Sequence, residues 1–188
     1  MTVQQIFELA MPMIDETPVN GVFDADRTAD YKEKAPFLLN VLQSEICRDC
    51  KIFKELTITK SGTEGYVKIT LPIDYLELYQ IFDKDLILYQ DFKRIGSEIY
   101  VPFDFNGKMV YKYQPTTLIS LASVVSVSDN IASTVLANGL ASQFITTENP
   151  DLASFFNQRF QEGKAMLNKP QIESSVKIID VYKSSLNH

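Results

Sequence analysis

Two aspartates and a threonine at alternating positions are the first residues that could do chemistry. Asp24, Asp26 and Thr28 match the D-x-D-x-T opening of phosphatases that use an aspartate nucleophile. Such a nucleophile must stand at the end of a buried parallel strand, but residues 18–21 have no strand pattern. The acids also lack the glycine and glutamate of an EF-hand calcium loop. We interpret them as caps of the helix that follows, because acids favour helix N-termini.

Cys47 and Cys50 form an isolated C-x-x-C pair. A structural zinc site needs two further ligands, which the chain does not offer within itself. A redox pair belongs at a helix N-terminus, whereas this pair falls near a predicted helix C-terminus, where the dipole raises thiol pKa values. We predict that both cysteines pack in the interior, and a metal shared between subunits stays open as the alternative. So few cysteines also favour a reducing compartment.

The other titratable groups indicate no active site. His188, the last residue, is the single histidine, which disfavours Ser-His-Asp triads and histidine-centred zinc sites. Residues 61–65 lack the Lys-Ser/Thr ending of a phosphate-binding loop. Four acids that could pair in a glycosidase have no diagnostic spacing: Glu45, Asp49, Glu55 and Glu64. We predict that the chain is not an enzyme and holds no cofactor or metal.

Tyrosines are concentrated in the middle of the chain, where they could form a platform for stacking sugars or bases. Alternating tyrosines on strands more often pack across strands or form an interface, and we favour that interpretation. The residues concerned are Tyr66, Tyr75, Tyr79, Tyr89, Tyr100, Tyr111 and Tyr113.

Composition places the chain among globular proteins and sets limits on its partners. The 188 residues are 45% hydrophobic and 22% charged, a composition that disfavours disorder. The net charge of −6 disfavours binding to phosphate groups. The negative charge comes almost wholly from residues 1–50, which hold nine acids and four bases. No apolar run approaches the length of a membrane span, and the N-terminus does not resemble a signal peptide. We expect no membrane partner.

Hydrophobic periodicity predicts two helices in the N-terminal part. Residues 2–15 form the first, with a capping box at Thr2 and a proline, Pro12, that weakens its last turn. The second covers residues 28–48, where Pro36 should bend the helix or begin a new one.

Two further helices are predicted near the C-terminus. One covers residues 128–146, with Ser128 or Asp129 as its cap and many small residues that allow close helix packing. The other covers 149–167 and begins at Asn149, with proline and an acid in its first turn. The helical stripes should share one core, formed by Leu42, Leu136, Leu140, Phe156 and Phe160.

Residues 56–113 are rich in β-branched and aromatic residues and are interrupted by turn signals, so we predict four to six short antiparallel strands. A hairpin is expected around residues 61–65. Asn106-Gly107 is the strongest hairpin dipeptide of the sequence, so a second hairpin is expected there. Asp74 should cap a single helical turn over residues 75–77.

These elements predict an α+β fold in which a helical core carries an inserted antiparallel β-rich module and an extended C-terminal arm. Residues 1–52 and 119–168 form the core, 53–118 the module, and 169–188 the arm.

The arm contains one strand-like run, residues 176–182, neither face of which is cleanly apolar. Such a strand suits addition to the edge of another sheet, where main-chain bonds provide affinity. The expected receivers are the module of a neighbouring subunit or a partner protein. Our candidate interface residues are Val176, Ile178, Ile179, Val181, Tyr182, Tyr111 and Tyr113.

Several segments have a familiar order and spacing: Asp30-Tyr31-Lys32 and Ala35-Pro36 within 30–45, then residues 129–141, 148–160 and 179–182. Together they resemble the head–tail connector, or neck adaptor, proteins of tailed bacteriophages. Residues 71–75 and Tyr113-Gln114-Pro115 are similar to β-modules of other phage neck proteins. Connectors of this kind are often more purely helical, so the insert is a departure from the family pattern.

The resemblance implies a structural protein of a virion or prophage that joins the portal to the tail. Its partners would be further copies of itself in a ring of about twelve, closed by heterologous contacts, the portal protein, and a tail or stopper protein. DNA would pass through the ring without sequence-specific binding, and an acidic lining would let it slide. The implied location is the virion neck, with the host cytoplasm during assembly. A small sugar- or protein-binding module using the tyrosine-rich insert is the alternative.

Overall fold

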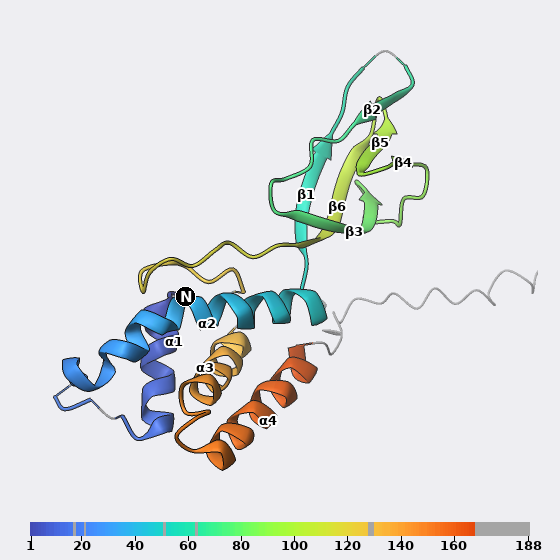
Figure 1. Cartoon of the computed structure of the whole chain (residues 1–188). Helices are drawn as coiled ribbons and strands as arrows, with labels where there is room; N and C mark the ends of the chain where they lie inside the picture. Colours follow the sequence, from blue (N-terminus) through green and yellow to red (C-terminus); the bar gives the residue numbers. More distant parts are fainter. Residues whose placement is uncertain (17, 21, 51, 63, 128–129, 168–188) are drawn as a thin grey trace, which may run out of the picture.

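The computed structural model describes residues 1–16, 18–20, 22–50, 52–62, 64–127 and 130–167. Figure 1 shows helices gathered in one body and a β-module that stands off the C-terminal end of α2. This is the predicted α+β class. The elements are α1 (Val3–Ala10), η1 (Met11–Ile14), α2 (Ala25–Asp49), β1 (Lys54–Thr59), β2 (Tyr66–Lys68), β3 (Tyr75–Asp83), β4 (Lys93–Ile95), β5 (Glu98–Pro102), β6 (Asn106–Tyr113), α3 (Asn130–Phe144) and α4 (Pro150–Leu167).

The first helix begins and ends where local chemistry dictates. The Thr2 hydroxyl accepts from the Gln5 N–H, and the Gln5 side chain accepts from the Thr2 N–H at 2.8 Å, so the predicted capping box is confirmed. After Ala10 the chain tightens into the 3-10 turn η1, which contains Pro12. Proline lacks the N–H that a continued α-helix would use.

Helix α2 starts three residues earlier than predicted and continues through Pro36 as one helix of 25 residues. The restart that we considered at Pro36 does not occur.

Helix α4 begins as predicted, because the Asn149 side chain accepts from the Leu152 N–H at 3.1 Å. The predicted caps of α3, Ser128 and Asp129, lie outside the described residues.

The three longer helices share one apolar core, as predicted. Its five expected members are all buried: Leu42, Leu136, Leu140, Phe156 and Phe160. Gly139 lies at the centre of the contact, where a Cβ atom would come within 2.9 Å of the Phe160 ring and 3.0 Å of the Leu42 side chain. A glycine at this position lets α3 approach both neighbouring helices closely.

The β-module consists of two three-stranded antiparallel sheets. The strand order is β1-β6-β3 in one sheet and β2-β5-β4 in the other. Strands β1 and β2 lie in different sheets, so the hairpin predicted around residues 61–65 is wrong. Because β1 instead pairs with β6, the first and last strands of the module lie side by side.

Two local predictions in the module are also wrong. Asn106 and Gly107 open strand β6 rather than forming a hairpin turn, and a Cβ on Gly107 would overlap the Phe82 carbonyl oxygen of β3. Close approach of two backbones therefore explains this glycine. The helical turn predicted after Asp74 is the beginning of β3, since pairing with β6 overrides the local capping pattern.

Residues 114–127 lead back from the module and are fastened to the helices. The Asn40 and Gln43 side chains of α2 donate to the carbonyl oxygens of Leu118 and Thr116 at 2.8 and 2.7 Å. The Val3 N–H of α1 donates to the Ser123 carbonyl oxygen at 3.0 Å. Gln114 still bonds to Asp74 of the module, and from Thr116 onward the returning segment is bonded to the helices.

Candidate interaction surfaces

The acidic motif before α2 is a helix cap, as predicted. One Asp24 carboxylate oxygen accepts from the N–H groups of Asp26 and Arg27 at 2.9 and 3.3 Å. The buried Thr28 hydroxyl donates to the Asp24 carbonyl oxygen at 2.6 Å. These bonds satisfy N–H groups that a helix start leaves without partners, and they occupy the Asp24 carboxylate that a phosphatase would use as its nucleophile.

Both cysteines are free and buried, in agreement with the packing interpretation. Burial raises the pKa of the Cys47 and Cys50 thiols, which opposes the thiolate that metal binding requires. Among the described residues, no group of three or more His, Cys, Asp or Glu side chains is placed to hold a metal ion. Cys47 and Cys50 are 2% and 1% exposed, so neither side chain lies on the surface of the described chain.

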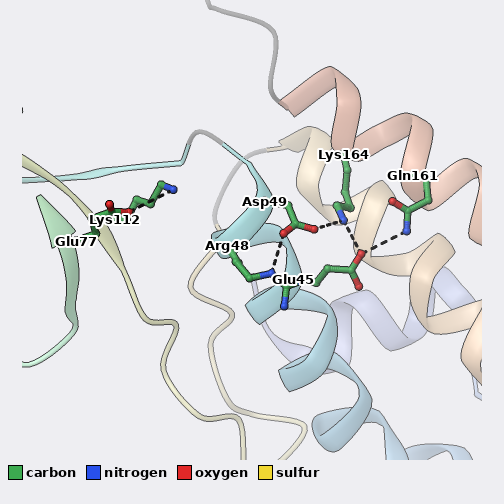
Figure 2. A network of polar contacts seen from close by, with 7 residues as sticks. All are labelled: Glu45, Arg48, Asp49, Glu77, Lys112, Gln161 and Lys164. Carbon is green, nitrogen blue, oxygen red and sulfur yellow. Dashed lines mark hydrogen bonds and ion pairs between the residues drawn. The ribbon is translucent and has the colours of Figure 1, made fainter. Parts of the chain in front are cut away.

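A buried lysine ties the C-terminal ends of α2 and α4 together (Figure 2). The Lys164 Nζ donates to Glu45 Oε1 and, at 2.8 Å, to Asp49 Oδ2, and its side chain is only 9% exposed. Gln161 also donates to Glu45, and Arg48 pairs with Asp49 at 2.8 Å. The two acids of this Lys164 clamp thus face a cation rather than each other, which does not fit an acid–base pair.

The clamp shifts the pKa values of Asp49 and Lys164 toward their charged forms. Hydrogen bonds from Arg48 and then Lys164 lower the pKa of Asp49 to about 2. Burial works to lower the pKa of Lys164, but its bonds with Asp49 and Glu45 outweigh burial and raise it. Asp49 and Lys164 therefore stay charged over the physiological pH range.

Sequence reasoning missed this clamp, although a signal for it exists. The buried residues of α4 are Ala153, Phe156, Phe160 and Lys164, so the lysine falls on the apolar stripe at helical spacing. A charged residue on such a stripe must find a partner in the interior.

Tyr111 and Tyr113 were predicted as interface residues, and this prediction needs correction. Their side chains are only 4% and 2% exposed. The Tyr111 hydroxyl lies 3.2 Å from Asp74, and the Tyr113 hydroxyl donates to the Ser126 carbonyl oxygen at 3.0 Å. Both side chains lie in the interior, where Tyr111 bonds within the module and Tyr113 joins the module to the segment that packs on the helical body.

Ion pairs follow the two sides of strand β6. Lys54 at the start of β1 pairs with Asp74 at 2.5 Å, and its Nζ lies over the Tyr113 ring at 4.3 Å from the centroid. On the outward face of the sheet, Lys112 pairs with Glu77 at 3.6 Å (Figure 2). The ends of the module next to the helices are therefore held by charge as well as by packing.

The exposed tyrosines do not form one platform. Tyr66 of β2 bonds to Asp91, and its ring lies under the Lys93 Nζ. Tyr79 of β3 stacks on Phe53 with ring centroids 4.1 Å apart. The two rings belong to different sheets, and each already has a partner within the chain.

The module also presents aliphatic side chains to solvent. A carboxylate oxygen of Asp83 accepts from the N–H groups of Asp85 and Ile87, both at 2.9 Å, and so shapes a tight loop. Leu86 in this loop has φ of 60°, a left-handed conformation that is uncommon for leucine. The exposed large aliphatic residues of the module are Ile73, Leu76, Leu86, Ile87, Leu88 and Ile95.

The remaining candidate interface residues lie outside the described part of the chain. They are Val176, Ile178, Ile179, Val181 and Tyr182 of the C-terminal arm.

Comparisons with known proteins add no relative. No protein-family model matches the sequence, and no curated protein matches it significantly. Within the described residues, no helix has both the length and the apolar character that crossing a bilayer requires.

Proposed function

We propose that this chain is a structural protein of a virion or prophage neck, where it forms a ring between the portal and the tail or stopper protein. About twelve copies would close the ring through heterologous contacts, and DNA would pass through its centre. The proposal assigns no reaction to the chain. Its site of action would be the virion neck, after assembly in the host cytoplasm.

The observation that carries this proposal is the exposed apolar stripe on the helical body. Phe37 and Val41 lie one turn apart on the face of α2 opposite the core, and they are 67% and 65% exposed. Phe155 and Met166 are likewise exposed on α4. Two separate apolar surfaces on one chain suit repeated head-to-tail association, in which one surface of a copy meets a different surface of the next.

The described parts of the resembling segments also support the proposal. Three of the four fall on α2, α3 and α4, which pack on one another around Gly139. The resemblance thus rests on parts of one helical body and not on unrelated surface stretches. The acidic N-terminal part of the chain agrees with a channel that repels phosphate and lets DNA slide.

Deleting the gene from the phage or prophage that carries it tests the proposal. We expect electron micrographs of the lysate to show separate heads and tails, because the joint between them is missing. The wild-type gene supplied in trans should restore joined particles. A variant with Phe37→Asp and Val41→Asp should not restore them, although it folds. Normal joined particles after the deletion would contradict the proposal.

A small binding module using the tyrosine-rich insert is the second candidate. A stacking site requires accessible rings on a shared surface. Tyr111 and Tyr113 are buried, and Tyr66 and Tyr79 are engaged on separate sheets. These observations favour the neck protein over the binding module.

A further inference from the structure

Strand β1 has a long edge without a strand partner among the described residues. It pairs with β6 over its whole length, from Lys54 opposite Tyr111 to Thr59 opposite Asn106, with no break in register. In the sheet order β1-β6-β3, strand β1 has β6 on one side, and its other side is an edge of the sheet. An open edge of this kind is a template for a further strand.

The groups on this edge follow from the hydrogen-bond pattern. Beyond the end of β1, the Lys60 N–H donates to the Phe105 carbonyl oxygen at 2.8 Å and continues the ladder with β6. Main-chain groups in an antiparallel ladder alternate between the two sides of a strand. The N–H and C=O groups of Glu55, Thr57 and Thr59 therefore point away from β6.

The other sheet edges are less suited to accept a strand. At the C-terminal end of β3, the N–H of Asp83 donates to Ile87 and the N–H of Tyr89 donates to Ile81, so a following segment covers that edge. The N-terminal half of β3 contains two register shifts, and such irregularities discourage edge pairing. Strands β2 and β4 have only three residues each.

A groove follows the β1 edge. Residues 56–60 line this groove together with Ile69 and Thr70. The groove lies in the module, apart from the exposed stripes of α2 and α4, so it offers a separate surface for association.

We propose that the β1 edge accepts residues 176–182 of a neighbouring copy as an added strand. This inference rests on the proposed ring, because a closed ring needs a donor surface and a different acceptor surface on each copy. The run has seven residues, against six in β1. Since main-chain bonds provide most of the affinity in strand addition, a run without a cleanly apolar face fits this use.

The position of the arm's starting point supports this occupant. Helix α4 ends at Leu167, close to the Lys164 clamp that holds it against the end of α2, and the Cys50 thiol lies 3.6 Å from the Lys164 carbonyl oxygen. Cys50 precedes β1 by only a few residues. The end of α4 thus lies near the start of the module. The eight residues 168–175 extend the chain by at most about 28 Å, which is long enough for residues 176–182 to leave their own helical body.

Hydrogen exchange of the full chain over a range of concentrations tests this inference. We expect protection of the Glu55, Thr57 and Thr59 amides to rise at least tenfold as copies associate, and we expect no such rise in a chain lacking residues 170–188. The truncated chain should keep the melting temperature of the full chain. Protection that is independent of concentration, or earlier melting of the truncated chain, would place the arm on its own module and overturn the inference.

A matched pair of variants at Thr57 gives an independent test. Thr57→Pro removes one outward N–H and leaves the ladder with β6 intact, whereas Thr57→Val keeps the N–H. Sedimentation velocity should show self-association at least tenfold weaker for the proline variant and unchanged for the valine variant. Equal association of both variants would overturn the inference. The gene deletion tests the neck proposal separately. Failure of heads and tails to join would support the neck role whichever result the Thr57 variants give.

Discussion

The helical body and the β-module of this protein are stabilised in different ways. The body buries large side chains completely, including Phe7 and Phe160, and its helices begin at side-chain caps close in sequence. The module consists of two three-stranded sheets, and ion pairs such as Glu55–Lys108 lie on its surface. Exposed pairs of this kind contribute at most about 1 kcal/mol. Since the module also buries Ile81, Ile99 and Met109 completely, the comparison teaches that local caps define the helices of the body, whereas pairing between distant strands defines the module.

The largest expected effect lies in the helical core. Phe156→Ala should lower the free energy of unfolding by about 3–5 kcal/mol, because it opens a cavity between α4 and its neighbours. The adjacent Phe155 is 47% exposed, so Phe155→Ala is a matched control that should cost under about 1 kcal/mol. Urea melts followed by circular dichroism measure both. Equal costs would mean that α4 is not anchored by the face that we describe.

A second variant tests whether the module unfolds apart from the body. In Gly107→Val the new side chain would overlap the Phe82 carbonyl oxygen, so we expect a loss of about 3 kcal/mol and separation of β3 from β6. Hydrogen exchange should show lost protection in the module and retained protection in α3. Gly96→Asn is the control. A Cβ atom on Gly96 would meet no atom of a non-adjacent residue within 4 Å, and asparagine tolerates the φ of +62° found there. Loss of protection in α3 would show that the two regions unfold together.

The Lys164 clamp should contribute less. Lys164→Met keeps much of the aliphatic stem but removes the bonds to Glu45 and Asp49, and we expect a loss of about 1–3 kcal/mol at pH 7. Lys34→Ala is the control, because the Lys34–Asp30 pair is exposed to solvent and exposed pairs contribute little to stability.

The pH dependence of this difference gives a sharper test. Asp49 has a folded pKa of about 2 against an ordinary value of 3.8. Its stabilising contribution is therefore complete above the ordinary value and is lost as the pH falls through about 2. The pKa of Lys164 is raised above its ordinary value of 10.5. Its stabilising contribution is therefore complete below pH 10.5 and is lost only as the pH rises through the raised value. Chemical melts should show a constant difference between wild type and variant around neutrality and a smaller one near pH 2. A difference that persists undiminished at pH 2 would contradict the clamp.

The smallest effect concerns the cap of α2. Asp24→Ala should cost about 1 kcal/mol, whereas Asp24→Asn should cost almost nothing, because asparagine also caps helices. Thermal melts of the two variants measure this difference. Hydrolysis of a phosphate ester by the wild-type protein that disappears in Asp24→Asn would identify a nucleophile instead of a cap.

Sequence reasoning worked where a signal and its effect lie within a few residues. Thr2, Asp24 and Asn149 each cap a helix whose start they predicted to within three residues. It failed where partners are distant, since Asn106 pairs with a residue of β1 some fifty positions earlier and no local pattern encodes that register.

The same limit applies to the candidate surfaces. Tyr111 and Tyr113 were predicted as interface residues, but the sequence did not indicate that their face of β6 would be buried. Lys164 lies on an apolar stripe, yet its partners Glu45 and Asp49 are more than a hundred residues away. Only the assembled fold brings such groups together.

The pairing of β1 with β6 has a consequence for the folding pathway. Helices α2 and α3 must find each other across the whole inserted module, and closing a long flexible loop costs entropy. Once Lys54 lies opposite Tyr111, the intervening chain no longer counts as flexible, and the effective loop between Leu42 and Leu136 shrinks by more than half. Each halving of a loop lowers its closure cost by about 0.6 kcal/mol. A module that folds early would therefore hasten docking of the helices on either side of it.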